Sequence, residues 1–333
     1  MKIKILLAII CCFLYINTTI AQRGNTYYLK NSGVEVPTKD SADFIRIVTE
    51  PDAKSTLYNI NEFYKNGKTK LIGKTIKLDP IVLDGECTTY FPSGKKQQHA
   101  NYEKGHLVGD VYNYYPNGRV YLYRQYITDT VRVPGKLNYL ILACNDSTGK
   151  ELITDGNGHY IGYDSDFKNI YEEGDVKSGL KTGNWIGNNG MDNDKVTFTE
   201  KYENGNFISG ESTDKSNNLF KYNIPETAPQ FKGGIQAFYN FLSKQNLSQS
   251  GNNSSLHITI YVSGVIEKDG TLDNLQLYRL TKNPEYSKII EALQRSPKWE
   301  PGTKYGQVVK TQYIFPINYG IDGPVKMIIR NVF

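Results

Sequence analysis

The feature that most constrains the fold of this chain of 333 residues is a short frame that recurs through residues 60–212. The frame is an aromatic residue followed by two variable positions and a glycine. Its copies are Tyr102-Glu103-Lys104-Gly105, Tyr171-Glu172-Glu173-Gly174 and Tyr202-Glu203-Asn204-Gly205, with looser forms in Tyr64-Lys65-Asn66-Gly67, Phe91-Pro92-Ser93-Gly94 and Tyr115-Pro116-Asn117-Gly118. The copies recur at roughly 20 to 30 residues, a period that is typical of stacked supersecondary units.

The glycines of these frames predict β-hairpins. Asn-Gly pairs at 66–67, 117–118 and 204–205 supply the residues with positive φ that tight hairpin turns require. Aromatic and β-branched residues flank them, as in residues 111–115. We therefore expect Gly118 and Gly205 at positive φ, and hairpins whose aromatic faces are buried only by their neighbours. Most of the 26 tyrosines are then core, and an exposed aromatic stripe that binds glycan is the alternative.

The frames resemble the MORN-like repeats of bacterial secreted proteins and of the YwqK-type antitoxin family. The resemblance covers most of residues 60–212 and weakens between Gln125 and Gly156, where the number of repeats stays open. It implies a scaffold or contact surface and no reaction.

The N-terminus indicates export. Lys2 and Lys4 precede an apolar run over residues 5–15, and Thr19 and Ala21 supply the small residues of a cleavage site. We expect residues 1–21 to be a signal peptide and the mature protein to be periplasmic. The run is shorter than the roughly 20 residues of a membrane-spanning helix, so a retained anchor is the less favoured alternative.

Charge and cysteine content bound the mature chain. Removing Lys2 and Lys4 lowers the net charge from +5 to 5 − 2 = +3, which is not the balance of a nucleic-acid-binding protein. Cys87 and Cys144 remain, either as a disulfide or as two isolated small hydrophobic residues. The length favours two domains, 22–222 and 223–333, joined by a polar linker around 212–223.

The last hundred residues predict two helices and three strands. A helix follows Gly233-Gly234, with its apolar face formed by Ile235, Phe238, Phe241 and Leu242. A half-buried strand covers 256–262, with a bulge at Gly264 and a turn at Asp269-Gly270 that leads into a return strand with Leu275 and Leu277. A second helix is capped by Asn283 and carries Tyr286, Ile289, Ile290 and Leu293, and a final strand places Val309, Thr311, Tyr313 and Phe315 on one face.

These residues resemble the TonB C-terminal domain over about residues 228–319. The motifs that carry the resemblance are Pro229-Gln230-Phe231-Lys232-Gly233-Gly234, Val265-Ile266-Glu267-Lys268-Asp269-Gly270, Trp299-Glu300-Pro301-Gly302, Gly306, Val309 and Phe315-Pro316-Ile317. The fold class expected is therefore mainly β: a MORN-like β-hairpin repeat sheet followed by an α+β TonB C-terminal-like domain.

The TonB-like resemblance implies binding by strand addition. Members of that family pair a strand with a short peptide from the plug of an outer-membrane transporter. The pairing edge expected here is Val308, Val309, Lys310, Thr311, Gln312, Tyr313, Ile314 and Phe315. Family members that transduce energy also have an inner-membrane anchor and a Pro-rich spanning segment, and we expect neither after cleavage.

Catalytic and metal-binding patterns are weak. The histidines His99, His106, His159 and His257 show no metal-ligand spacing, so no metal or cofactor is expected. Residues 155–158 and 192–194 suggest calcium loops but are better explained as turns. Trp299 is interpreted as a packing residue of its turn, with partner docking as the alternative.

The leading hypothesis is an exported, non-enzymatic envelope protein that binds a protein partner, favoured as a TonB-dependent outer-membrane receptor in transmembrane transport. One alternative is a protein that binds cell-wall glycan such as peptidoglycan. The other is an exported hydrolase that uses Cys144, with His159 as its base, or an acidic pair.

Overall fold

The computed structural model describes residues 24–78, 80–127, 138–191, 194–245, 258–277 and 285–319. The expected signal peptide, His257 and the expected cap at Asn283 lie outside the described residues. The mainly β class is confirmed, with two helices among the described residues. Neither of them has the length and apolar character needed to cross a membrane.

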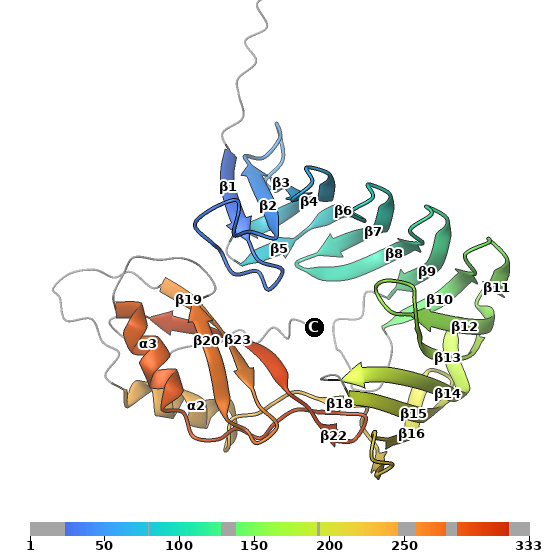
Figure 1. Cartoon of the computed structure of the whole chain (residues 1–333). Helices are drawn as coiled ribbons and strands as arrows, with labels where there is room; N and C mark the ends of the chain where they lie inside the picture. The colour runs from blue at the N-terminus through green and yellow to red at the C-terminus, as the bar shows by residue number, and fades with distance from the viewer. Residues whose placement is uncertain are drawn as a thin grey trace, which may run out of the picture.

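The described residues between 24 and 222 form one antiparallel sheet of 17 strands, here called the repeat sheet. Each strand pairs with the next along the chain, except that β6 pairs with β4, which also pairs with the short β5. The sheet bends into an arc, and the C-terminal elements lie across its opening (Figure 1). The strands are β1 (Gly24–Leu29), β2 (Phe44–Thr49), β3 (Tyr58–Tyr64), β4 (Thr69–Leu78), β5 (Ile81–Leu83), β6 (Gly85–Tyr90), β7 (Lys96–Glu103), β8 (His106–Tyr114), β9 (Val120–Tyr126), β10 (Tyr139–Asn145), β11 (Glu151–Thr154), β12 (Asn157–Tyr163), β13 (Ile170–Lys177), β14 (Leu180–Met191), β15 (Asp194–Glu203), β16 (Asn206–Thr213) and β17 (Leu219–Tyr222).

The longer turns of the repeat sheet are tied to one another by side chains. Asn66 donates from Nδ2 to the carbonyl of Pro92 (3.1 Å), and Asn117 makes the same bond to Ser147 (2.9 Å). The hydroxyl of Tyr115 donates to the carbonyl of Asn145 at 2.9 Å. The aromatic residue and the asparagine of one turn therefore donate hydrogen bonds to backbone carbonyls at the next long turn. This contact between successive turns gives the sequence period a physical cause.

The short turns contain two residues at positive φ. Asn204 and Gly205 have φ of 48° and 79°, and Lys104 and Gly105 have 48° and 84°. Gly118, in a longer turn, has φ of 91°, so the positive φ predicted for Gly118 and Gly205 is confirmed. An L side chain with a Cβ rarely occupies this region, which is why glycine stands at these positions.

One aligned frame is not a turn. Gly174 lies within β13, paired with Trp185 of β14, whereas the turn after β13 falls at Ser178 and Gly179 with φ of 51° and 80°. A Cβ on Gly174 would penetrate the indole ring of Trp185. The match of residues 171–174 to the turn frames is therefore wrong, because this glycine provides space for a ring.

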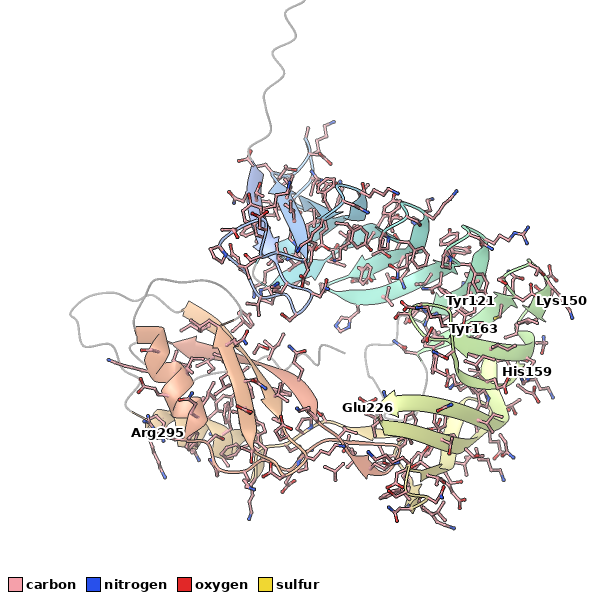
Figure 2. The ribbon with its side chains drawn as sticks, in the orientation of Figure 1. Tyr121, Lys150, His159, Tyr163, Glu226 and Arg295 are labelled. Atoms are coloured by element: carbon pink, nitrogen blue, oxygen red, sulfur yellow. The ribbon has the colours of Figure 1, made fainter. Side chains whose placement is uncertain are left out.

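Other aromatic rings on this face also pack over glycines. Phe198 lies over Gly187 and Tyr222 over Gly210, in each case across a strand pair. The prediction that most tyrosines form the hairpin core is confirmed only in part, because the other described tyrosines of the repeat sheet are half-buried. The buried ones are Tyr115, Tyr121, Tyr160, Tyr202 and Tyr222. Tyr121 and Tyr163 lie close together (Figure 2), and their rings meet edge to face with centroids 5.8 Å apart.

The repeat sheet also buries charged groups. Glu62 accepts hydrogen bonds from Arg46 at 2.6 Å and from Lys70 at 2.5 Å. Lys181 donates to Glu172 at 2.8 Å, with its ammonium over the ring of Trp185. These pairings offset the cost of removing the charges from water. Cys87 and Cys144 are buried and free of any disulfide, which resolves that alternative.

The described residues of the C-terminal unit, residues 225–319, form two small sheets and two helices. In one sheet β19 is central between β20 and β23, and in the other β21 is central between β18 and β22. Both helices pack on one side of the β20-β19-β23 sheet, and its other side faces the interior of the arc (Figure 1). The elements are β18 (Glu226–Thr227), α2 (Gly234–Ser243), β19 (Ile258–Ile266), β20 (Leu272–Leu277), α3 (Glu285–Gln294), β21 (Thr303–Lys304), β22 (Gln307–Val308) and β23 (Thr311–Tyr319).

Several local predictions for this unit are confirmed. The register of β19 on β20 shifts at Gly264, as expected for a bulge, and Gly270 has φ of 83° in the expected turn. Trp299 is buried against Phe231, Phe238 and Phe315, as its packing interpretation requires. Ile235 is an exception, because it is exposed at the start of α2 rather than on the buried face.

The expected linker is part of the folded structure. Ser212 is buried in β16, and residues 219–222 form β17 of the repeat sheet. The polar sequence was misleading because the hydroxyl of Ser212 donates to the carbonyl of Tyr305, 93 residues away, at 2.7 Å. A long-range hydrogen bond of this kind satisfies a polar side chain inside the protein.

Candidate functional site

The expected pairing segment is divided between two strands. Val308 ends β22, where it pairs with Thr303, and the amide of Val309 donates to the carbonyl of Gly302 at 3.0 Å. Lys310 lies between the strands and forms an ion pair with Glu267 at 2.9 Å. The single strand expected over 308–315 is therefore wrong in its bounds, since β23 runs from Thr311 to Tyr319.

The remaining candidate residues lie together on β23. Thr311, Gln312, Tyr313, Ile314 and Phe315 pair with residues 262–266 of β19, within a register that continues to Tyr319. Within the described residues β23 pairs with β19 alone, so it is an edge strand of the β20-β19-β23 sheet. An edge strand offers a row of backbone donors and acceptors to an added strand.

Pro316 defines which backbone groups face the edge. It lies inside β23, opposite Tyr261, without interrupting the register. Because proline has no N–H, it fits a strand only where its nitrogen points away from the paired neighbour. Backbone groups alternate along a strand, so Gln312, Ile314 and Asn318 share this orientation, and their N–H groups are the donors on the open side.

The side chains of β23 also alternate between two environments. Phe315 and Ile317 are buried in the core with the helices, and Tyr313 packs against that core. Gln312 is exposed and donates from Nε2 to the hydroxyl of Ser263 at 3.2 Å on the other face. One face of the strand is thus fixed by the core and the other is accessible.

A hairpin anchors the start of β23 to the repeat sheet. Tyr305, at the tip between β21 and β22, stacks on Phe198 of β15 with ring centroids 4.2 Å apart and planes 10° apart. Gln307 donates to the hydroxyl of Ser212 at 2.9 Å. A second, exposed contact joins Lys77 of β4 to the hydroxyl of Tyr261 in β19 at 3.4 Å. The C-terminal unit thus touches the repeat sheet near both ends of the arc.

Cys144 lacks the environment of a nucleophile. Burial raises the pKa of Cys144 to about 11, which keeps the thiol protonated. His159 bonds instead to Asp175, with Nδ1 2.8 Å from its carboxylate, at the outer side of the arc (Figure 2). The pairing required by the hydrolase alternative has no support in these contacts.

The loops considered for calcium have simpler explanations. Asp155 and Gly156 have φ of 49° and 74°, which are values of a two-residue hairpin turn. Of residues 192–194, only Asp194 is described. Within the described ranges no group of three His, Cys, Asp or Glu side chains is placed to hold a metal ion.

Comparisons of this chain with protein-family models, with curated proteins and with solved structures gave no match.

Proposed function

We propose that this protein binds an extended peptide segment of a partner by adding it as a strand to the open edge of β23. The partner class we favour is a TonB-dependent receptor of the outer membrane, met in the periplasm. The sequence resemblance and the expected signal peptide support the partner class and the compartment, and the unpaired backbone of β23 supports the edge.

The observation that carries the proposal is that β23 has one paired and one unpaired backbone side among the described residues. Its inner side is paired with β19 over nine residues from Thr311 to Tyr319, so adding a strand requires no rearrangement of the sheet. The donors on the outer side are Gln312, Ile314 and Asn318, and Pro316 interrupts the series. A peptide that pairs here gains main-chain hydrogen bonds, each worth about 0.5–1.5 kcal/mol net.

A proline substitution tests the edge in the full-length protein. Ile314→Pro removes one outward donor and places a ring in the path of an incoming strand, while the pairing with β19 should persist because the Ile314 amide does not serve it. Affinity for a panel of receptor plug peptides, measured by isothermal titration calorimetry, should fall about tenfold or more. Ile314→Ala is the matched control, since it retains the amide, and it should bind within about threefold of wild type.

The reverse change sharpens the test. Pro316→Val restores an outward N–H and should strengthen binding of a peptide long enough to reach it. Circular dichroism must show that each variant is folded. Equal binding by folded wild type and Ile314→Pro would show that β23 is not the edge, and failure of wild type to bind any plug peptide would remove the receptor as the partner class.

A further inference from the structure

The side of the repeat sheet that carries Tyr112 and Tyr123, here called the open face, has an aligned cross-strand row. The row runs through Thr88, His99, Tyr112, Tyr123 and Ala143, on five successive strands from β6 to β10. Its last member is only a methyl group. The height of the side chains above the sheet therefore falls sharply between Tyr123 on β9 and Ala143 on β10.

The ring beside this drop is held in place. Tyr112 and Tyr123 stack with centroids 4.6 Å apart and planes 7° apart. The hydroxyl of Tyr123 donates to Asp110 at 2.9 Å, and Gln125 donates to the same carboxylate oxygen at 3.3 Å. Because Tyr112 covers the β8 side of the Tyr123 ring, the other ring face is directed toward β10, above Ala143.

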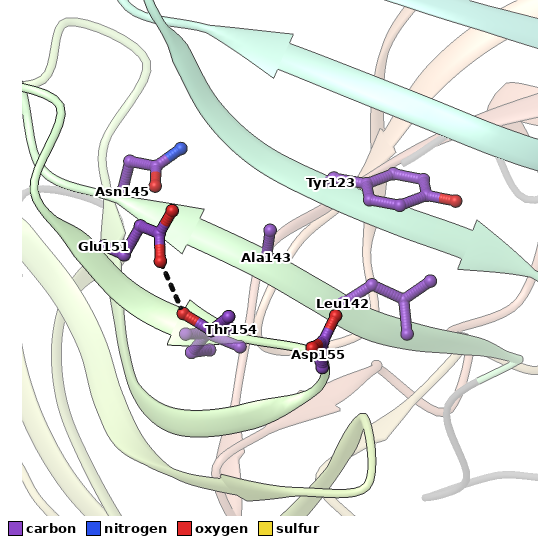
Figure 3. A pocket seen from close by; sticks show the side chains of 8 residues that line it. Tyr123, Leu142, Ala143, Asn145, Glu151, Thr154 and Asp155 are labelled. Carbon is purple, nitrogen blue, oxygen red and sulfur yellow. Dashed lines mark hydrogen bonds between the residues drawn. The ribbon is translucent and has the colours of Figure 1, made fainter.

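A hollow of about 430 Å³ lies next to that ring face (Figure 3). Ala143 lies centrally in it, Tyr123 stands at one side, and Glu151 and Thr154 lie at the other. Two irregularities in strand pairing adjoin it, one between Ile141 and Ala143 and one between Cys144 and Asn145. Such bulges redirect side chains and often border binding sites.

The polar groups of the hollow are mostly acceptors. Asn145, Glu151, Thr154 and Asp155 line it, and no lysine or arginine is among the lining residues. Glu151 accepts a hydrogen bond from the hydroxyl of Thr154 at 2.8 Å, which orients its carboxylate (Figure 3). The remaining carboxylate oxygens suit a ligand that presents several O–H donors.

We propose that this hollow binds one sugar ring of a glycan, a hexopyranose stacked on Tyr123. The apolar C–H face of the sugar would lie on the open ring face, and its hydroxyl groups would donate to Glu151 and Asp155. An aromatic platform with a few convergent polar groups is the usual composition of a small-molecule site. This binding activity is separate from strand addition at β23, because the two sites share no residue.

Saturation-transfer NMR and calorimetry with the full-length protein test the proposal. The probes are chitotriose, cellotriose and maltotriose, and we expect at least one of them to bind. Tyr123→Ala should weaken that binding about tenfold, since it removes the aromatic ring on which the sugar stacks. Tyr28→Ala, a tyrosine of β1 outside the hollow, is the matched control and should leave affinity unchanged.

Glu151→Gln distinguishes a neutral sugar from a cation. Glutamine retains an acceptor without the charge, so sugar affinity should change no more than about threefold and should be insensitive to salt. Spermine is the cationic probe, because a ring face with two carboxylates also attracts ammonium groups. Binding of spermine that is lost in Glu151→Gln and in high salt, without sugar binding, would overturn the proposal. So would sugar binding that survives Tyr123→Ala. Neither result bears on peptide binding, which is read from the β23 variants.

Discussion

The repeat sheet and the C-terminal unit bury their aromatic residues in two different ways. In the C-terminal unit two helices cover a sheet, and rings such as Phe238 and Phe315 pack between the layers. The aromatic rings of the repeat sheet instead pack on the neighbouring strands of the same sheet, with Trp185 over Gly174 and Phe198 over Gly187. In the repeat sheet the space left by glycine thus allows an aromatic ring to be buried, whereas in the C-terminal unit the helices bury the rings.

The two regions also differ in the charge of their interiors. Among the described residues, the buried charged side chains Glu62, Lys181 and Glu200 all belong to the repeat sheet. In the described part of the C-terminal unit the buried polar side chain is Ser263, which carries no charge. The chain has two tryptophans, Trp185 in the first region and Trp299 in the second, so fluorescence of single-tryptophan variants can follow each region separately.

The largest effect is expected from removing a ring in the layered core. Phe238 is fully buried and contacts Phe231, Trp299 and Phe315. Phe238→Ala should lower the free energy of unfolding of the C-terminal unit by about 3–5 kcal/mol through lost burial and a cavity. Denaturant unfolding in a Trp185→Phe background measures it through Trp299. A loss below 1 kcal/mol would mean that this core is not packed as described.

Adding one methyl group should be almost as damaging in the repeat sheet. A Cβ at Gly187 would overlap both the ring of Phe198 and the backbone carbonyl of Tyr171. Gly187→Ala should therefore cost about 1–3 kcal/mol or more, because the backbone cannot move aside. Gly67→Ala is the control: its φ is 80° but no atom lies within 4 Å, so only backbone strain of about 1 kcal/mol is expected. Equal losses for the two variants, followed through Trp185, would contradict ring-over-glycine packing.

The smallest effect concerns pH. Burial raises the pKa of Glu200, which accepts hydrogen bonds from Tyr202 at 2.8 Å and Tyr222 at 3.0 Å. The native state then binds more protons than the unfolded state above about pH 4.3, so the free energy of unfolding should fall as pH rises from there through the raised pKa.

Glu200→Gln should flatten that slope and raise the neutral-pH unfolding free energy by up to about 1 kcal/mol. The fluorescence of Trp185 should report this difference, because Trp185 on β14 pairs with Glu200 on β15. The fluorescence of Trp299 should not report it. Parallel pH profiles for the variant and wild type would show that Glu200 does not titrate as inferred.

The sequence predicted features that depend on neighbours along the chain. Positive φ at Gly118 and Gly205, the bulge at Gly264 and the buried Trp299 all follow from local residue chemistry. Gly174 was wrongly aligned with the turn glycines, because the sequence does not distinguish a glycine that adopts positive φ in a turn from one that makes room for an aromatic ring.

Features that depend on distant pairing were missed. Ser212 looked like linker because its partner Tyr305 lies on another element. The break after Val308 also escaped prediction, since it requires pairing of β22 with β21. The hollow at Tyr123 depends on the register that sets Ala143 opposite the ring, and the sequence signal available for it was the cluster of aromatic residues at 112–126.

The hairpin that carries Tyr305 also determines how a mechanical load would pass through the protein. A partner strand paired with β23 would pull on β23, and only residues 309 and 310 separate β23 from β22. The β21-β22 hairpin is in turn fixed to Phe198 and Ser212 of the repeat sheet. Tension along β23 would load its antiparallel pairs with β19 in shear, where many bonds resist together. The partner strand, the hairpin and the repeat sheet therefore form one series of links, and helices α2 and α3 stand outside that series.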